Sequence, residues 1–278
     1  MAEGPLTDKR RTRRKATVFL GGGRITAALL AGLRLSGYSG RVIVHDRNPD
    51  KLRNLRREFQ VDVERDLRSA VEQAEILIVA VRPASVAELL GEIAGCGAVA
   101  RPMLGISLAA GIPLRKLQAS LDTVRWARAM PSPVCRIGHG LTAVTFARNV
   151  TGPECKRVRK LFERVGPVLL MAESRFDAFN AVYSPSHGYH ALATLVAAAE
   201  RSGLDRKTAL IAGAHAFAEA ILYWRVSGQT LSDLLHESAT PGGTSAATMA
   251  AMKAAGYERA IQRGIEAGIR QARANARR

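Results

Sequence analysis

The first residues of this chain with a type and spacing suited to chemistry are three consecutive glycines, Gly21 to Gly23. They follow a short apolar, β-branched run, Ala16–Leu20, of the kind that forms a buried strand. From Ile25 to Leu35, alanine and leucine recur at helical spacing. A strand, a glycine turn and a helix in this order are the context of a dinucleotide-binding fingerprint, so the pattern predicts a nucleotide at this turn.

Each residue of the predicted turn has a separate physical role. Gly21 permits the tight turn and Gly23 lets the backbone approach a pyrophosphate. The helix start at Arg24 and Ile25 offers unpaired N–H groups and the positive end of a helix dipole. Thr26 stands where the third glycine of the fingerprint is expected, so a glycine-rich turn without a nucleotide remains the alternative.

The end of the second predicted strand, Arg41–His45, is where a dinucleotide fold selects its cofactor. An acidic residue there binds the ribose 2′-OH of NAD, whereas arginine accommodates the 2′-phosphate of NADP. Asp46 and Arg47 favour opposite cofactors. Because Asn48 adds a hydrogen-bond donor beside Arg47, we expect NADP, with NAD as the alternative.

The composition, 47% hydrophobic and 23% charged in 278 residues, is typical of a globular protein with two domains. The net charge of +17 would attract phosphorylated cofactors, carboxylates or nucleic acid. Residues 1–15 hold six basic side chains and are expected to form a disordered basic tail. The other basic residues are scattered without interleaved aromatics, which favours a solvated surface and disfavours nucleic acid as a partner.

The cysteines, Cys96, Cys135 and Cys155, are odd in number and widely spaced, with no histidine at ligand spacing. This pattern predicts free thiols in a reducing compartment, here the cytoplasm, and no metal site. The arginines before Ala16 also resemble a twin-arginine export signal, but Arg24 interrupts the apolar region, so export is the minor alternative. No run is long and apolar enough to span a membrane.

Further apolar runs alternate with helical patterns up to residue 172, and after residue 173 all patterns are helical. We therefore expect an α/β doubly wound sheet of the Rossmann type over 16–172 and an all-helical domain over 173–278. The expected strands after the second are 75–81, 103–107, 124–130, 141–146 and 167–171, and the expected late helices are 182–199, 206–226, 231–236 and 244–276. The helical half has more apolar residues than isolated helix faces would bury, which predicts a partner chain.

A second glycine motif, Thr240–Ser245, resembles the S-P-G-G-T-T signature of the pyrroline-5-carboxylate reductases. Other landmarks of that family follow in the same order along the chain. F-I-G-x-G-N-M-A resembles Phe19–Thr26, A-V-K-P resembles Ala80–Pro83, S-I-A-A-G-I resembles Ser107–Ile112, R-x-M-P-N-T-P resembles Arg128–Pro133, and D-A-V-T-A resembles Asp177–Ala181.

The resemblance implies an NAD(P)H-dependent oxidoreductase with a Rossmann domain and a helical dimerisation domain, working as a homodimer or a larger homo-oligomer. The implied reaction is hydride transfer to a small cyclic imine carboxylate, pyrroline-5-carboxylate or a close analogue. Val81, Arg82, Pro83 and Met130 then join the cofactor-binding residues, with Pro83 and Met130 facing the nicotinamide.

In that family the glycine loop binds the substrate carboxylate, which assigns Gly242, Gly243, Thr244 and Ser245 to the substrate. A Gly-Gly turn at a helix start, followed by two hydroxyls, is also a suitable carboxylate cradle on physical grounds. An ordinary helix-to-helix turn capped by Ser or Thr is the alternative. The family's hydroxyl near the imine nitrogen corresponds here to that of Ser245.

The chain departs from the family between Tyr183 and Tyr189, where the family has S-G-S-G-P-A-Y, and at Ser132, which replaces an Asn-Thr pair. Within the first segment, His187 has a pKa range that suits proton transfer near neutral pH. His187, Tyr189 and Ser245 are therefore the candidate catalytic residues. A hydrogen-bonded histidine at a helix start is the alternative for His187.

Three other functions compete with this hypothesis. A related two-domain hydroxyacid dehydrogenase would need a lysine on the first long helix of the helical domain, and residues 182–199 contain none. A reductase of the same fold with a different imine or keto-acid substrate is compatible with the altered Ser184–Tyr189 segment. So is an NADP-binding or regulatory protein that has lost catalysis.

Overall fold

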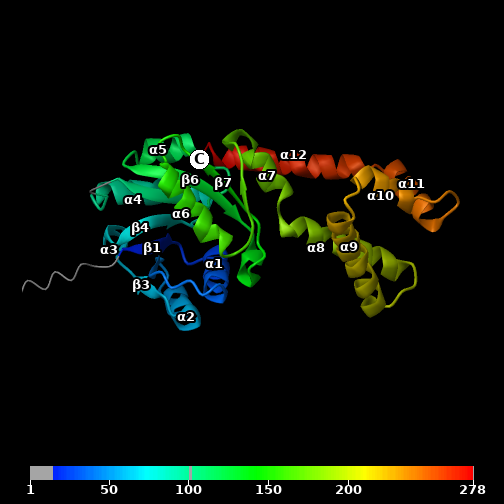
Figure 1. Cartoon of the computed structure of the whole chain (residues 1–278), viewed down its shortest axis with the longest axis horizontal. Coiled ribbons are helices and arrows are strands. Elements are labelled where there is room, and N and C mark those ends of the chain that lie inside the picture. The colour runs from blue at the N-terminus through cyan, green and yellow to red at the C-terminus, as the bar shows by residue number, and fades with distance from the viewer. Residues whose placement is uncertain (1–14, 100–101, 278) are drawn as a thin grey trace, which may run out of the picture. The chain divides into compact units, whose positions relative to one another are not determined.

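The computed structural model describes residues 15–99 and 102–277 and divides the chain into two compact units. Of the described residues, 15–99, 102–180 and 269–277 form the first unit, and 181–268 form the second (Figure 1). The boundary between the units thus lies at Ala181, and residues 269–277 belong to the first unit. The sequence predicts a single boundary at residue 173. The expected basic tail lies, apart from Lys15, outside the described residues.

An eight-stranded sheet forms the first unit in the order β3-β2-β1-β4-β5-β6-β7-β8. The strands from β1 to β6 are parallel, β7 runs antiparallel to β6, and β8 is parallel to β7. The strands are β1 Ala16–Leu20, β2 Val42–His45, β3 Asp62–Glu64, β4 Ala74–Val79, β5 Met103–Ser107, β6 Val124–Pro131, β7 Thr142–Phe146 and β8 Val168–Leu170. This order, with crossovers on both sides of β1, confirms the doubly wound Rossmann-type sheet.

Helices cover both faces of the sheet (Figure 1). One apolar layer lies under α1 (Arg24–Leu35), α2 (Pro49–Phe59) and α6 (Gly152–Glu163), and the other lies under α3 (Leu67–Glu72), α4 (Val86–Gly95) and α5 (Leu114–Ser120). Side chains of β1 alternate between them, since Phe19 joins the first layer while Val18 and Leu20 join the second. The short helices η1 (Pro83–Ser85), η2 (Pro133–Ile137) and η3 (Glu173–Arg175) lie in the connections.

A half-buried ion pair stabilises the start of α6. Thr151 caps the helix, and its N–H and hydroxyl each donate a hydrogen bond of 2.9 Å to Oε2 of Glu154. Arg125 donates to the same carboxylate, with 2.6 Å between Nη2 and Oε1. Burial by itself would raise the pKa of Glu154, but the bonds from Arg125 and Thr151 outweigh it and lower the pKa to about 2.

This carboxylate makes the stability of the fold depend on acid pH. A lowered pKa contributes stability that is complete above the unfolded value of 4.5 and is lost as the pH falls toward 2. The shift corresponds to roughly 3 kcal/mol of unfolding free energy at neutral pH. We expect Glu154→Gln to destabilise the protein at pH 7 and to flatten the acid limb of a plot of Tm against pH. Glu163→Gln, at the exposed pair with Arg159, should leave that limb steep; equal slopes in both variants would contradict the assignment.

The second unit is helical. Its elements are the end of α7 (Phe176–Val182), α8 (Pro185–Arg201), α9 (Arg206–Ser227), α10 (Leu231–Ser238), α11 (Thr244–Ala254) and the larger part of α12 (Tyr257–Asn275). Helices α8 and α9 pack closely at Gly213, where an added Cβ would lie 3.1 Å from the Leu192 side chain. The all-helical character expected after the sheet is therefore confirmed.

Two predicted helices have different bounds. The single helix expected over 244–276 is wrong, because it is interrupted after Ala254. Gly256 adopts a left-handed conformation with φ of +83°, and its N–H bonds the carbonyl of Lys253, which closes one helix before the next begins. The helix expected from Val182 begins at Pro185, because the hydroxyl of Ser184 caps it.

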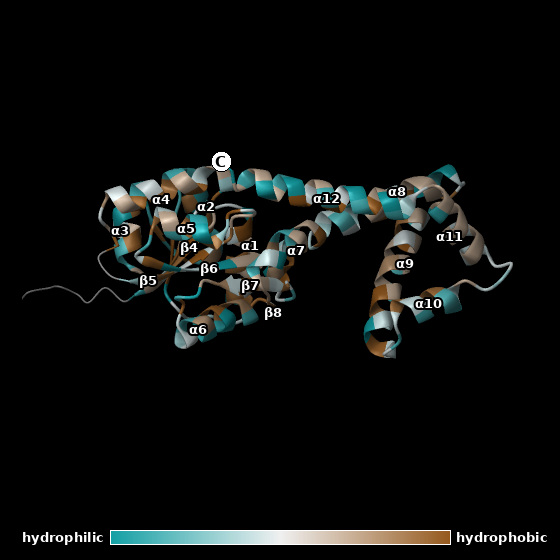
Figure 2. Cartoon of the chain, turned by 90° about the horizontal axis from the view of Figure 1, so that it is seen from above, coloured by the Kyte–Doolittle hydropathy of each residue, from teal (hydrophilic) through white to brown (hydrophobic). Residues whose placement is uncertain are grey.

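Much of the apolar surface of the second unit is exposed. On α9 these side chains belong to Leu210, Ile211, Phe217, Ile221, Leu222, Tyr223, Trp224 and Val226. Figure 2 shows strongly hydrophobic positions along its ribbon. A helix that exposes this much apolar surface needs a partner face. Among the described residues, none of the helices has the length and apolar character that a bilayer crossing requires.

Candidate functional site

The glycine turn after β1 is tightly packed on one side and open on the other. Gly21 has φ of +113°, and an added Cβ would lie 2.7 Å from the carbonyl oxygen of Ala80. Its N–H donates to the carbonyl of His45 at 2.8 Å, which ties the turn to the end of β2. Gly23 precedes α1 with no side-chain cap, and a Cβ there would meet no atom within 4 Å. Only backbone therefore faces the open side, as an approaching pyrophosphate requires.

Thr26, the residue in place of the third glycine, strengthens this turn. Its side chain is fully buried, and its hydroxyl donates a hydrogen bond of 2.6 Å to the carbonyl of Gly21. The strand and helix therefore accommodate a larger residue because its polar atom is satisfied.

This bond predicts the effect of an isosteric change at Thr26. In Thr26→Val the shape is kept but the Gly21 carbonyl loses its donor, so we expect about 1–3 kcal/mol less stability in urea unfolding. Thr26→Ser keeps the hydroxyl and is the matched control for the bond. A valine variant that is as stable as the serine variant would contradict this role.

Asp46 holds the glycine turn instead of extending into solvent. Its Oδ2 accepts the N–H of Gly22 at 2.7 Å, its Oδ1 accepts the N–H of Asn48 at 2.8 Å, and Lys51 lies 3.4 Å from Oδ2. Burial alone would raise the pKa of Asp46, but these hydrogen bonds and the charge of Lys51 outweigh it and lower the pKa. Both carboxylate oxygens thus accept backbone hydrogen bonds, which hold Asp46 against the glycine turn.

A cavity of 520 Å³ opens over this turn. Four of its lining residues are cationic: Arg24, Arg47, Lys51 and Arg82. The other lining residues are Leu20, Gly21, Gly23, His45, Asp46, Ala80, Val81, Ser85 and Leu89. A concave surface with four cations and one engaged carboxylate is complementary to a phosphorylated ligand.

The structure thus brings Gly21, Gly23, Arg24, Arg47, Val81 and Arg82 of the predicted cofactor residues into one cavity. It does not place Ile25, Asn48, Pro83 or Met130 in the cavity wall. Lys51 is the cation that the sequence analysis missed. The sequence feature that could have indicated Lys51 is the N-cap residue Asn48. This cap starts α2 at Pro49 and so places Lys51 in its first turn, next to the end of β2.

Arg47 and Asn48 both already have partners. Nη2 of Arg47 is 3.1 Å from Oε1 of Glu88 and also contacts Glu92, both on α4. The hydrogen bond and the charge of Glu88 raise the pKa of Arg47. Asn48 uses its Oδ1 to accept the N–H groups of Asp50 and Lys51, so its amide NH₂ is the group that remains for a ligand.

The predicted nicotinamide contacts lie after β4 and on β6, two strands that are separated by β5 in the sheet. Pro83 begins η1 after β4, and Met130 lies near the end of β6. Ser132, which replaces the family's Asn-Thr pair, is 3% exposed and accepts the N–H of Val134 at 3.2 Å. Its hydroxyl thus stabilises the start of η2.

In the second unit, the predicted carboxylate loop is a glycine turn that starts α11. Gly242 has φ of +77°, and the N–H of Gly243 donates to the carbonyl of Thr240 at 2.9 Å. Helix α11 begins at Thr244 with no side-chain cap. The N–H groups of Thr244 and Ser245 therefore point out of the helix start without a partner in the helix, whereas that of Gly243 is already used.

The candidate proton donors lie on α8 and α11. Nε2 of His187 is 2.6 Å from the carbonyl oxygen of Ala181, so this nitrogen carries the proton and Nδ1 remains for another contact. This geometry is that of the hydrogen-bonded histidine considered as the alternative. The side chain of Tyr189 is 69% exposed. The side chains of His187 and Tyr189 are thus both exposed within the second unit.

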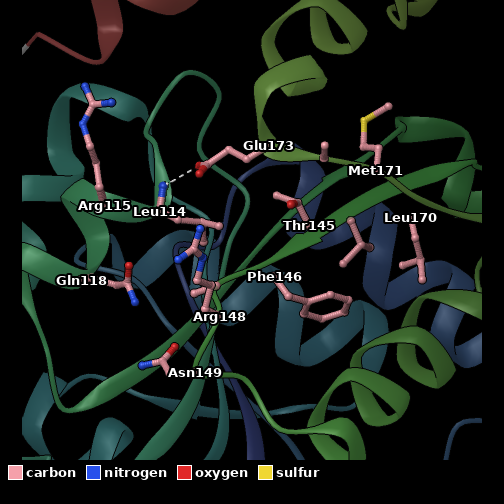
Figure 3. A pocket seen from close by; sticks show the side chains of 13 residues that line it. Leu114, Arg115, Gln118, Thr145, Phe146, Arg148, Asn149, Leu170, Met171 and Glu173 are labelled. Atoms are coloured by element: carbon pink, nitrogen blue, oxygen red, sulfur yellow. Dashed lines mark hydrogen bonds between the residues drawn. The ribbon is translucent and has the colours of Figure 1, made fainter.

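A second cavity, of 670 Å³, lies between α5, β7 and the segment after β8 (Figure 3). It contains none of the predicted site residues. Figure 3 shows Glu173 reaching the backbone of Leu114, a hydrogen bond of 2.6 Å. Within residues 15–99 and 102–277, no group of three His, Cys, Asp or Glu side chains is placed to hold a metal ion.

Comparisons with known proteins identify two family domains along the chain. Residues 17–112 match the domain described as NADP oxidoreductase coenzyme F420-dependent, and residues 173–275 match the pyrroline-5-carboxylate reductase dimerisation domain. A pyrroline-5-carboxylate reductase of Mycobacterium tuberculosis is 32% identical over 254 residues, 82% of this chain and 86% of that protein. The chain belongs to the pyrroline-5-carboxylate reductase family. The resemblance inferred from the sequence motifs is therefore confirmed.

Further members of the pyrroline-5-carboxylate reductase family match over similar lengths. The enzyme of Corynebacterium melassecola is 30% identical and covers 82% of this chain and 86% of its own. The Plasmodium falciparum pyrroline carboxylate reductase, solved with NADP bound, has a TM-score of 0.85 at 18% identity, over 95% of this chain and 99% of its own. The Streptococcus pyogenes enzyme also has a TM-score of 0.85, at 21% identity, and the match covers 95% of this chain and 100% of that enzyme. These structures share the fold of this chain.

Proposed function

We propose that this protein is an NADPH-dependent oxidoreductase that reduces pyrroline-5-carboxylate to proline. Membership of the reductase family along most of the chain is the observation that carries the proposal. The cationic cavity over the glycine turn and the Gly242–Gly243 turn at the start of α11 supply two anion-binding surfaces. These surfaces match the two charged ends of the reaction, a phosphorylated cofactor and a substrate carboxylate.

The residues around the first turn fit NADPH. The open backbone at Gly23 and the first N–H groups of α1 would hold the pyrophosphate, and Arg47 and Lys51 would hold the 2′-phosphate. When bound, NADPH supplies a hydride to the carbon of the substrate C=N bond. Because Arg47 and Lys51 both line the cavity beside the end of β2, NADP is favoured over NAD.

The start of α11 would bind the substrate. The N–H groups of Thr244 and Ser245 are placed to donate to a carboxylate, and the dipole of α11 favours a negative charge there. The Ser245 hydroxyl would lie near the imine nitrogen, in the role that the family assigns to its threonine. Binding at the carboxylate and at the nitrogen orients the ring carbon for hydride transfer.

A proton must reach the imine nitrogen, and His187 is the proposed donor, with Tyr189 as the second candidate. We expect His187→Ala to lower turnover about a hundredfold while NADPH affinity, measured by fluorescence titration, stays within about twofold. His190→Ala, on the same helix, is the control and should keep full turnover. A His187→Ala enzyme with normal turnover would assign the histidine to the helix start alone.

The identity of the substrate is the most specific part of the proposal. The altered Tyr183–Tyr189 segment favours a related cyclic imine as the second candidate substrate. The test is steady-state oxidation of NADPH with pyrroline-5-carboxylate, pyrroline-2-carboxylate and piperideine carboxylates side by side. The highest kcat/KM is expected with pyrroline-5-carboxylate. No turnover with any of them, together with tight NADPH binding, would instead indicate a binding protein.

We also propose that the second units of two or more copies pack together through the exposed apolar face of α9. The three cysteines are unpaired, which favours a reducing compartment, here the cytoplasm. Sedimentation should give a homodimer or a larger assembly, and Ile221→Glu should shift it toward monomer. A wild-type monomer at micromolar concentration would contradict this assembly.

A further inference from the structure

Arg47, the residue expected to bind the 2′-phosphate, is held by two carboxylates of another element. Glu88 and Glu92 lie one turn apart on α4, so both side chains face the same way. Glu88 lies 3.1 Å from Nη2 of Arg47, and Glu92 contacts the same nitrogen. Leu89, between them in sequence, lines the cavity over the glycine turn. The two carboxylates therefore lie at the rim of the cofactor cavity.

The other charged groups around this cavity are arranged differently. Lys51 lies 3.4 Å from Asp46, whose carboxylate is committed to the backbone of Gly22 and Asn48. Arg24 and Arg82 line the cavity, and the described residues provide no carboxylate partner for either. Among the four cations, Arg47 alone is neutralised by two acidic side chains.

All three members of the Arg47 cluster are solvent-accessible, with side-chain exposures of 64% for Arg47, 59% for Glu88 and 43% for Glu92. Exposed ion pairs are weak, and a phosphate with two negative charges can displace them. Displacement still has a cost, because the two carboxylates stay close to the arriving phosphate and repel it.

On the basis of the proposed function, we propose that Glu88 and Glu92 compete with the 2′-phosphate of NADPH for Arg47. The two carboxylates thereby set how strongly the site prefers NADPH over NADH. NADH lacks the phosphate, so it neither displaces these ion pairs nor meets their repulsion. Removing the carboxylate charges raises the preference for NADPH, and it does so through Arg47.

The test is direct binding of NADPH and NADH, measured by fluorescence titration without substrate. In Glu88→Gln/Glu92→Gln, the Kd for NADPH is expected to fall about three- to tenfold, while the Kd for NADH changes less than twofold. The gain for NADPH should shrink at high ionic strength, since the competing ion pairs are exposed. Glu72→Gln, which removes one carboxylate from the exposed pair with Arg68 on α3, is the control for lost charge and should leave the ratio of the two Kd values unchanged.

A double-mutant cycle with Arg47→Met isolates the route of the effect. In the Arg47→Met background, the two glutamine substitutions should no longer tighten NADPH, because the contested arginine is absent. A gain that persists there would assign the effect to general repulsion and overturn the competition. A weaker NADPH affinity in Glu88→Gln/Glu92→Gln would also overturn it, because the carboxylates would then be orienting Arg47 for the phosphate. Wild-type protein that binds neither cofactor would overturn the proposed function itself, a different result from either of these.

Discussion

Gly21→Ala is expected to lower NADPH affinity at least a hundredfold and to destabilise the first unit. The alanine Cβ would lie 2.7 Å from the carbonyl oxygen of Ala80 and 3.2 Å from Cγ1 of Val81, so β4 or the turn must move. The backbone at this position also has φ of +113°, which a side chain disfavours. Strain and overlap together correspond to roughly 2–6 kcal/mol of unfolding free energy. Urea unfolding and NADPH fluorescence titration measure the two effects.

Two companion variants separate the loss of binding from the loss of stability. Gly23→Ala places its methyl group in open space, so stability should hold while NADPH affinity falls, because the methyl occupies the approach of the pyrophosphate. Gly91→Ala, inside α4 and also without neighbours, should be about 0.5–1 kcal/mol more stable with unchanged affinity. Unchanged NADPH binding in both Gly21→Ala and Gly23→Ala would contradict the placement of the cofactor at this turn.

The sheet could be predicted from the sequence because its signals are local. Buried parallel strands are continuous apolar runs, and on that basis the sequence predicts a strand over Glu75–Val81, close to the observed β4. The glycine turn followed from the residues next to β1. The short strand β3, Asp62–Glu64, was not predicted, because its residues are partly exposed and show no apolar run.

The charged network of the cofactor cavity could not be predicted in the same way. Arg47 pairs with Glu88 and Glu92, which are 41 and 45 residues further along the chain. Such partners are brought together by the crossover through β4 and α4, and no spacing rule relates them. From the sequence, Asp46 is a candidate ribose ligand, and only the fold shows its hydrogen bond with the N–H of Gly22. Sequence motifs thus identified the turn, and the tertiary structure assigned the roles of the side chains around it.

The helical unit shows another limit of local patterns. The run 244–276 is rich in alanine and helix-forming residues. Gly256 is therefore the only residue at the helix break that indicates it in the sequence. Tyr183–Tyr189 departs from the family motif, and the structure assigns Ser184 to the cap of α8 and His187 to the carbonyl of Ala181. Local hydrogen bonds thus explain the presence of Ser184 and His187 at the start of α8. Contacts of either residue with a substrate stay a prediction.

Arg128 is a buried cation whose importance the sequence did not indicate beyond its place in a family motif. Its side chain is 3% exposed and lies on β6, two residues before Met130. Nη1 is 3.1 Å from Glu173, Nη2 is 3.4 Å from Asp177, and the guanidinium carbon lies 4.6 Å from the centre of the Phe176 ring. One strand thus binds η3 and α7, the last elements of the first unit before Ala181.

Arg128→Met is expected to destabilise the first unit by about 2–3 kcal/mol. The loss leaves Glu173 and Asp177, which are 36% and 31% exposed, without a counter-charge, and it removes the contact of the buried guanidinium with Phe176. Glu173 still accepts the N–H of Leu114 at 2.6 Å, so the effect should stay below that of a fully buried carboxylate. Urea unfolding measures it through the midpoint at constant m.

The matched controls for Arg128→Met test the charge argument directly. Arg68→Met breaks an exposed pair with Glu72 and should cost less than about 1 kcal/mol. In Arg128→Met/Glu173→Gln/Asp177→Asn no carboxylate is left unpaired, so part of the lost stability should return. If the triple variant is less stable than Arg128→Met alone, the carboxylates themselves stabilise η3 and α7, and Arg128 acts mainly through its contact with Phe176. The comparison therefore distinguishes charge pairing from packing as the link between β6 and the end of the first unit.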